Sequence, residues 1–181
     1  VKGKSESMSE PIQAYAILDR SQKTKVLKEI ILSRNDNDPR MDQDLKNLSA
    51  EEKSILKEFY FTVPGEERNT KGTVAFLLGR ELKSDKDYET AAEILNEPNC
   101  LSFDDCNKTD NTETRQIEEH DGVQSISLEY PRLVMMRWLA ASASKSPNRK
   151  AQIVEILKEQ IANANPLVSL EAKSLLEKKK K

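Results

Sequence analysis

The chain has 181 residues, of which 36% are hydrophobic and 33% charged, and its formal net charge is −2 at pH 7. This length suffices for one domain with a hydrophobic core or for a short array of stacked repeats, and the charge balance gives no general attraction to nucleic acid or anionic membranes. No apolar run reaches the about 18 residues expected of a transmembrane helix, and so few Gly (5) and Pro (7) residues do not suit an all-β fold.

The N-terminal part of the chain predicts a polar leader followed by helix. Residues 1–10 are polar and aperiodic, which indicates a flexible leader. Between Pro11 and Ile31 apolar residues recur at spacings of three and four, so one helix or two closely joined helices are expected. Ser21 is a candidate N-cap for the second of them. The polar stretch 33–39 ends this segment, and a short element is expected at 41–48.

Three helices are expected in the middle of the chain. Ser49 and Glu52 have the spacing of a capping box, which opens a helix that ends at Pro64 and Gly65. Its apolar positions are Ile55, Leu56, Phe59 and Tyr60. Two further amphipathic helices are expected at about 70–82 and 85–96.

Helices resume in the C-terminal third. Pro131 suits the first turn of a helix whose apolar residues continue to Ala141, and another helix is expected at 147–162. The last helix begins with Pro166 in its first turn and continues to Lys178. The basic tail 179–181 suits the solvated end of that helix better than a binding patch.

The predicted helices form a weak internal repeat. Segments 15–39, 76–99 and 137–166 share one plan, in which an apolar helix end, a polar turn and a second amphipathic helix are followed by an Asn-containing stop with Pro. Such a unit cannot cover its own apolar face, whereas stacking against neighbouring units does.

Three segments carry a resemblance to a known family. NANPLVSLEAKSLLEK (163–178) resembles the first helix of a HEAT or armadillo-type repeat, in which Asn-Pro or Asp-Pro opens the helix and Val, Ala and Leu pack inward. YPRLVMMRWLAASA (130–143) and KGTVAFLLGREL (71–82) are similar to the same helix. The resemblance implies an α-solenoid that binds other macromolecules, usually proteins, and it transfers no residue-level site. Irregular repeat lengths and a long insertion depart from the family pattern.

The expected fold is therefore all-α. It is a short HEAT-like stack of about six to eight helices, forming a single domain over 11–178, with an acidic loop inserted at 97–129.

The inserted loop contains both cysteines of the chain. Cys100 and Cys106 lack the C-x-x-C spacing of a thioredoxin-like pair, and a zinc site would need further Cys or His ligands, of which only His120 exists. The spacing favours a local disulfide, which would stabilise the fold by about 2.4 kcal/mol at most, over two free thiols or a metal site. A disulfide indicates an oxidising compartment, periplasmic or extracellular; free thiols would fit a cytoplasmic protein.

The same loop is rich in carboxylates that hard cations prefer. The acidic residues are Asp104, Asp105, Asp110, Glu113, Glu118, Glu119 and Asp121. The pattern fails the EF-hand sequence at Thr109 and has no Gly at the required position. A solvated acidic loop is the simpler interpretation, and a weak cation site is the alternative. We interpret His120 as part of a polar segment at the end of the loop, where Gly122 supplies a turn.

Residues 123–130 alternate apolar and polar side chains, which favours an extended segment returning to the scaffold; the alternative is the start of the helix that follows. The helix that follows contains Met135, the neighbouring Met136 and Trp138 at helical spacing, which is typical of a core. The alternative is a peptide-binding groove lined by Arg132, Met135, Arg137 and Trp138, because Met and Trp suit adaptable binding surfaces.

The sequence contains no Walker motif, no G-x-G-x-x-G and no H-E-x-x-H, so neither a cofactor nor catalysis is expected. The expected function is a non-catalytic scaffold or adaptor that binds a partner protein through a helix-lined surface. The alternative is an exported ligand- or cation-binding protein that uses the acidic loop 104–121. A hydrolase that uses loop carboxylates is a third and weaker hypothesis.

Overall fold

The computed structural model describes residues 15–35, 37–108 and 128–178. All regular secondary structure in these residues is helical, which confirms the all-α class. The predicted leader 1–10 and the basic tail 179–181 lie outside the described residues.

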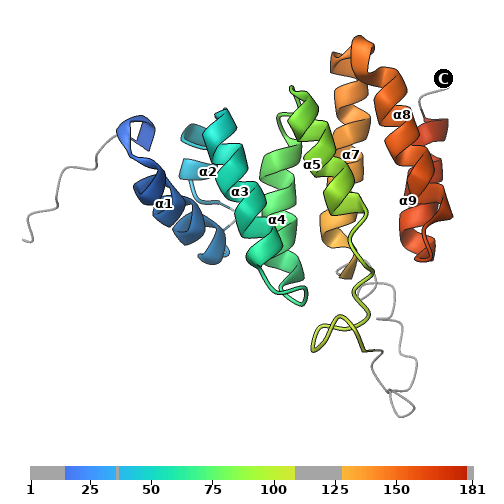
Figure 1. The fold of residues 1–181 in the computed structure, drawn as a ribbon, viewed down its shortest axis with the longest axis horizontal. Coiled ribbons are helices and arrows are strands. Elements are labelled where there is room, and N and C mark those ends of the chain that lie inside the picture. Colours follow the sequence, from blue (N-terminus) through green and yellow to red (C-terminus); the bar gives the residue numbers. More distant parts are fainter. Residues whose placement is uncertain (1–14, 36, 109–127, 179–181) are drawn as a thin grey trace, which may run out of the picture.

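Within the described residues, eight α-helices and three short 3-10 turns follow one another along the long axis and form a stack (Figure 1). The α-helices are α1 (Arg20–Leu32), α2 (Arg40–Gln43), α3 (Ala50–Thr62), α4 (Arg68–Gly79), α5 (Asp85–Leu95), α7 (Tyr130–Lys145), α8 (Lys150–Glu159) and α9 (Pro166–Glu177). The 3-10 turns are η1 (Tyr15–Ile17), η2 (Pro147–Arg149) and η3 (Gln160–Ala162). The predicted insertion separates α5 from α7, and the structure describes residues 96–108 and 128–129 of it.

Local capping explains where the helices begin. Ser49 and Glu52 form the predicted capping box of α3: the Ser49 hydroxyl accepts from the Glu52 N–H at 3.2 Å, and the Ser49 N–H donates to the Glu52 carboxylate at 2.6 Å. Ser21 is not a cap, so that prediction is wrong. Asp19 holds the position instead, because its carboxylate accepts from the Gln22 N–H at 2.9 Å and starts α1 at Arg20.

The prediction of an extended segment at 123–130 is wrong for the C-terminal end of this range. Leu128 is helical and Tyr130 is the first residue of α7, while 123–127 lie outside the described residues. Leu128 is buried, and its carbonyl accepts from Arg68 Nε at 2.5 Å. This contact holds the chain against α4 just before Pro131 starts α7.

One hydrophobic core runs through the stack, with α4 packed most closely on α7 at its centre. Its fully buried side chains include Leu45, Leu56, Tyr60, Val74, Leu77, Ile94, Leu95, Met135, Met136, Leu139, Ile153 and Leu157. None of the helices within 15–35, 37–108 and 128–178 combines the length and apolarity needed to cross a membrane.

The close approach of α4 to α7 depends on a glycine. A Cβ atom added at Gly79 would lie 2.9 Å from the Cβ of Trp138 and 2.8 Å from its Cδ1. Because the Trp138 Cβ is fixed to the backbone of α7, the side chain cannot swing away, and the two helices would have to separate. At Gly72 the added atom would lie 2.1 Å from Cδ1 of Tyr130, a closer clash, but one with ring atoms of a side chain that is 37% exposed and not with a Cβ fixed to the backbone.

We therefore expect Gly79→Ala to lower the free energy of unfolding by about 1 to 2 kcal/mol, because overpacking outweighs the gain in helix propensity. Urea denaturation followed by far-UV circular dichroism measures this change. Gly72→Ala is the matched control and should have a smaller effect. Equal or greater stability of Gly79→Ala would show that the two helices are not packed this closely.

Candidate functional site

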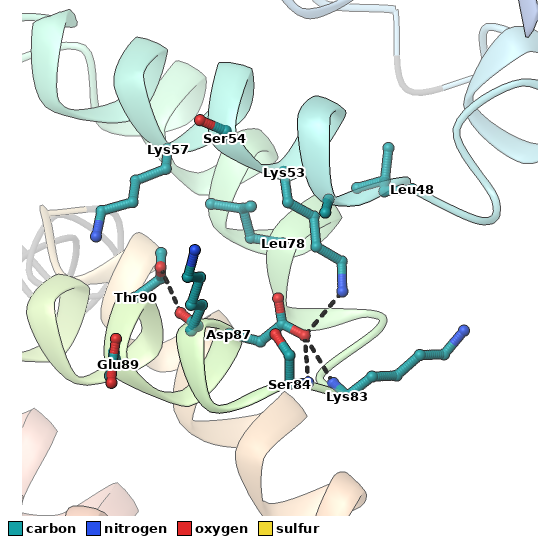
Figure 2. A pocket seen from close by; sticks show the side chains of 12 residues that line it. Leu48, Lys53, Ser54, Lys57, Leu78, Lys83, Ser84, Asp87, Glu89 and Thr90 are labelled. Atoms are coloured by element: carbon teal, nitrogen blue, oxygen red, sulfur yellow. Dashed lines mark hydrogen bonds and ion pairs between the residues drawn. The ribbon is translucent and has the colours of Figure 1, made fainter.

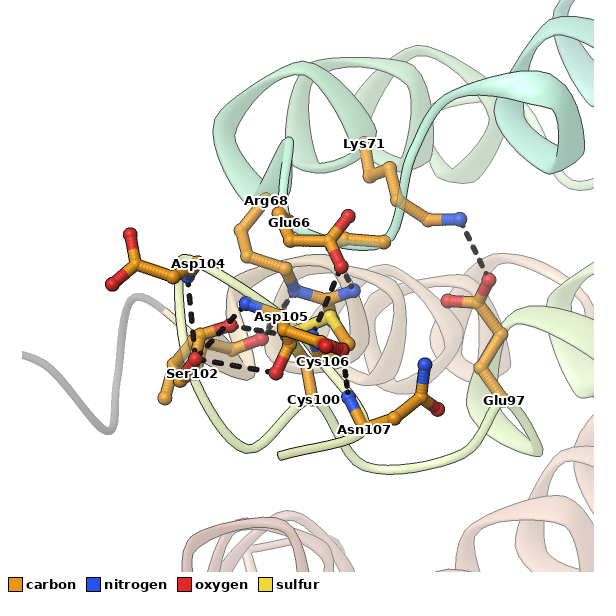
Figure 3. Close-up of a disulfide and its surroundings, with 12 residues drawn as sticks. Glu66, Arg68, Lys71, Glu97, Cys100, Ser102, Asp104, Asp105, Cys106 and Asn107 are labelled. Carbon is orange, nitrogen blue, oxygen red and sulfur yellow. Dashed lines mark hydrogen bonds and ion pairs between the residues drawn. A yellow bond between two sulfur atoms is a disulfide. The ribbon is translucent and has the colours of Figure 1, made fainter. Parts of the chain in front are cut away.

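The predicted disulfide partners close a short turn after α5 (Figure 3). The sulfur atoms of Cys100 and Cys106 lie 2.01 Å apart, at disulfide distance. The Leu101 N–H donates to the Cys106 carbonyl at 3.0 Å. The Ser102 hydroxyl oxygen accepts from the N–H groups of Asp104 and Asp105 at 3.2 and 3.1 Å. The turn is thus fixed by backbone hydrogen bonds as well as by the sulfur pair.

The turn is attached to the segment that precedes α4. The Cys106 N–H donates to the Glu66 carboxylate at 3.0 Å, and this hydrogen bond lowers the pKa of Glu66 below its ordinary value. A Cβ added at Gly65 would lie 2.8 Å from the Cys106 sulfur, so only glycine leaves room for this approach. The turn therefore has a defined position on the helical stack.

The acidic loop offers no metal site within the part of the chain that the structure describes, since no three His, Cys, Asp or Glu side chains gather there as metal ligands would. The Asp105 carboxylate already has partners within the turn, because it pairs with Lys108 at 2.9 Å and accepts a hydrogen bond from the Asn107 N–H. The Lys108 ammonium and that N–H lower the pKa of Asp105. Residues 110–121, including His120, lie outside the described residues, so the cation alternative remains a prediction for them.

A buried ionic network joins α7 to the chain that follows α5. Arg132 and Glu129 are both fully buried and lie 3.3 Å apart, from Nη1 to Oε2. Arg132 also donates to the Glu97 carbonyl and the Asn99 side-chain oxygen, and Asn165 Nδ2 donates to Glu129 at 3.0 Å. Burial raises the pKa of Glu129 above its ordinary value, although the positive charge of Arg132 opposes that shift.

The network extends to α3 and α4 through Glu97. Its carboxylate pairs with Lys71 Nζ at 2.8 Å and accepts from the Tyr60 hydroxyl at 2.7 Å. Burial, together with the negative charge of Glu97, raises the pKa of Tyr60. The members come from five parts of the stack, so the network fixes how these parts meet.

The residues predicted to line a peptide groove are not brought together. Arg132 and Met135 are fully buried, so they cannot contact a partner, and that alternative is wrong for these two residues. Arg137 is exposed and pairs with Glu171 at 2.7 Å. Trp138 is partly buried and packs edge-on against Phe76, with ring centroids 5.7 Å apart.

A groove of about 530 Å³ lies between α3 and α5, on residues that the sequence did not single out (Figure 2). Its lining residues are Leu48, Ala50, Lys53, Ser54, Lys57, Leu78, Lys83, Ser84, Lys86, Asp87, Glu89 and Thr90. Four lysines face two carboxylates, so the lining carries a formal charge of +2. Ala50 is exposed in the groove, whereas Leu48 and Leu78 border it with only 7% and 5% of their surface exposed.

Two of the lysines extend from α3 toward α5, as Figure 2 shows. Lys53 is structural, because its Nζ pairs with Asp87 at 2.9 Å and donates to the Glu81 carbonyl at 2.6 Å. Burial alone would raise the pKa of Asp87, but N–H donors at Ser84 and Lys83 and the Lys53 charge outweigh it, so the pKa is lowered. This carboxylate therefore caps α5 and holds one wall of the groove.

The other lysines are available to a ligand. Lys57 pairs with Glu93 at 2.8 Å in a partly exposed contact, and Lys83 pairs with Glu81 at 3.0 Å through an exposed side chain. Lys86 is exposed on α5. The Lys57–Glu93 pair is partly exposed and contributes little stability, so a carboxylate ligand can replace Glu93 at little cost; the Glu81 side chain is only 14% exposed, so replacing it at Lys83 costs more.

Comparison with known proteins identifies no relative: no family model, no curated protein and no solved structure matches the chain.

Proposed function

We propose that this protein is a non-catalytic scaffold or adaptor, which binds an extended acidic segment of a partner protein in the groove between α3 and α5. The observation that carries this proposal is the excess of lysines along one groove, whose aliphatic stems lie beside the exposed Ala50. Stacked helices commonly present extended binding surfaces of this kind, which also supports the proposal.

The two parts of the groove have different tasks in this proposal. Ala50 and the aliphatic stems of the lysines provide the apolar surface that a ligand can cover, because Leu48 and Leu78 are only 7% and 5% exposed. The ammonium groups of Lys57 and Lys86 attract carboxylates, so they select for acidic ligands and speed the encounter. The preferred ligand therefore alternates apolar and acidic side chains.

We also propose that the protein works in an oxidising compartment, periplasmic or extracellular. The disulfide-distance pair Cys100–Cys106 supports this, because such bonds persist in oxidising surroundings.

A short synthetic peptide of alternating leucine and aspartate, carrying a fluorophore, tests the groove. We expect it to bind the wild-type chain, and to bind the double variant Lys57→Glu, Lys86→Glu about tenfold more weakly, because both replacements put negative charge beside the carboxylates. Fluorescence anisotropy at low and moderate salt measures both affinities.

The matched control is Lys25→Glu, Lys173→Glu, which makes the same change in net charge at exposed positions of α1 and α9. It should bind like the wild type, and a peptide with lysine in place of aspartate should not bind. Equal loss of affinity in the two double variants would mean that net charge, not the groove, governs binding. No binding of the leucine–aspartate peptide would contradict the proposal itself.

A further inference from the structure

The two central helices of the stack, α4 and α7, run in the same direction. Gly72 of α4 faces Tyr130 at the start of α7, and Gly79, at the other end of α4, faces Trp138 in the middle of α7. The N-termini of both helices therefore lie at one end of the stack. Because helices of 12 and 16 residues carry positive dipole ends at their N-termini, this end favours negative charge.

Buried cations outnumber buried carboxylates at this end of the stack. Arg68, Lys71 and Arg132 lie in the first turns of α4 and α7 and are 3%, 4% and 0% exposed. Of the carboxylates packed among them, Glu97 pairs with Lys71. Glu129 pairs with Arg132. Among the described residues, no carboxylate lies within ion-pair distance of Arg68, so its buried charge has no counter-charge there.

The Arg68 guanidinium also has a donor without an acceptor. Its Nε and Nη1 donate to the carbonyls of Leu128 and Gly65, which are neutral groups. Its Nη2 is buried and has no hydrogen-bond partner in the residues that the structure describes, and the same holds for Nε of Arg132. Buried N–H groups of a charged side chain are costly to leave unpaired. A bound group that accepts from them removes this cost.

The two arginines lie close together although they belong to different helices. Burial lowers the pKa of Arg132, and the positive charge of Arg68 lowers it further. Both charges also act on Glu129, where they oppose the rise in pKa that burial causes. Glu129 repels an anion, but its charge is balanced by Arg132. The charge of Arg68 remains.

A small anion meets these requirements better than water does. Water accepts hydrogen bonds from the unpaired N–H groups but leaves the positive charge of Arg68 without a counter-charge. An anion supplies both, and the two helix N-termini stabilise it further. A monovalent ion suits the site, because the excess is a single positive charge.

We propose that a small monovalent anion of the size of chloride binds between the N-terminal ends of α4 and α7, where Arg68 Nη2 and Arg132 Nε donate to it. The anion is a structural ligand that strengthens the contact between the two helices. The site shares no residue with the groove between α3 and α5, so this inference does not depend on the proposed function.

Thermal denaturation at constant pH and ionic strength tests the site, with sodium chloride replaced stepwise by sodium gluconate, whose anion is large. We expect chloride to raise the melting temperature of the wild type by about 2 to 4 °C and the effect to saturate, because an anion that binds only the folded chain stabilises it. The variant Arg68→Met should lose this response. Arg137→Met is the matched control, since this arginine of α7 is exposed and pairs with Glu171, and it should respond like the wild type.

Crystals grown with sodium bromide give a second measurement, which decides the question if Arg68→Met does not fold. Bromide is close to chloride in size, and its anomalous scattering should place a peak beside Arg68 and Arg132. Equal melting temperatures in chloride and gluconate, or a chloride response that Arg68→Met retains, would overturn the proposal. Crystals with no bromide beside Arg68 would overturn it as well. Peptide binding in the groove is measured separately, so neither proposal falls with the other.

Discussion

Replacing Arg132 with methionine is expected to lower the free energy of unfolding by about 3 to 5 kcal/mol, because it leaves Glu129 buried without its cationic partner. Both side chains are fully buried, so water cannot solvate the remaining carboxylate. The substitution also removes the donors to the Glu97 carbonyl and the Asn99 side chain, which hold the chain after α5 against α7. Methionine has a similar length and leaves no large void.

Urea denaturation measures this effect, and Arg137→Met is the matched control on the same helix. The Arg137 side chain is 61% exposed, so its loss should change stability by less than about 1 kcal/mol. Adding Glu129→Gln to Arg132→Met should recover part of the stability, because the neutral amide needs no counter-charge and still accepts from Asn165. Equal effects of the two arginine substitutions would contradict the buried network.

We expect reduction of the Cys100–Cys106 disulfide to lower the free energy of unfolding by about 2 kcal/mol. In the chain-entropy model, the bond stabilises the fold because it closes a short loop in the unfolded chain. Urea denaturation with and without a phosphine reductant measures it. The variant Cys100→Ser, Cys106→Ser is the control: its stability should be low and unaffected by the reductant.

Mass measurement of the intact chain under non-reducing conditions decides whether the bond exists in the protein as isolated. Two free thiols, together with a stability that the reductant does not change, would remove the argument for an oxidising compartment.

Local signals in the sequence predicted much of the fold. The Ser49–Glu52 capping box and the prolines at 131 and 166 act within one helical turn, so their effect can be read from neighbouring residues. The wrong prediction of Ser21 as a cap also concerns neighbouring residues, because Asp19, two positions earlier, is the residue that caps the helix. The helical stack followed from apolar periodicity, which reports which face of each helix is covered.

The interior ionic network could not be predicted in this way. Arg132 lies on a helix among apolar residues, and its partners Glu97 and Asn99 are more than 30 positions away. The neighbouring sequence does not distinguish a buried arginine of this kind from an exposed one such as Arg137. The sequence therefore predicts the same groove-lining role for both. Burial depends on how α4, α5 and α7 pack together.

The groove was missed for a related reason, although a partial signal existed. Lys53 and Lys57 are four positions apart and therefore share one face of α3. Such a stripe usually marks a solvated surface. Its significance depends on α5 and the turn before it, which bring Lys86 and Lys83 to the opposite wall. The sequence contains both stripes, but only the packing of the helices shows that they face one groove.

The location of peptide binding tests the central claim most directly. A nitrogen-15 labelled sample titrated with the leucine–aspartate peptide should show amide chemical-shift changes concentrated on α3 and α5, around Lys57, Lys86 and Thr90. The amides of α1 and α9 should stay unchanged. Changes centred on another part of the stack, with the groove amides unaffected, would contradict the account.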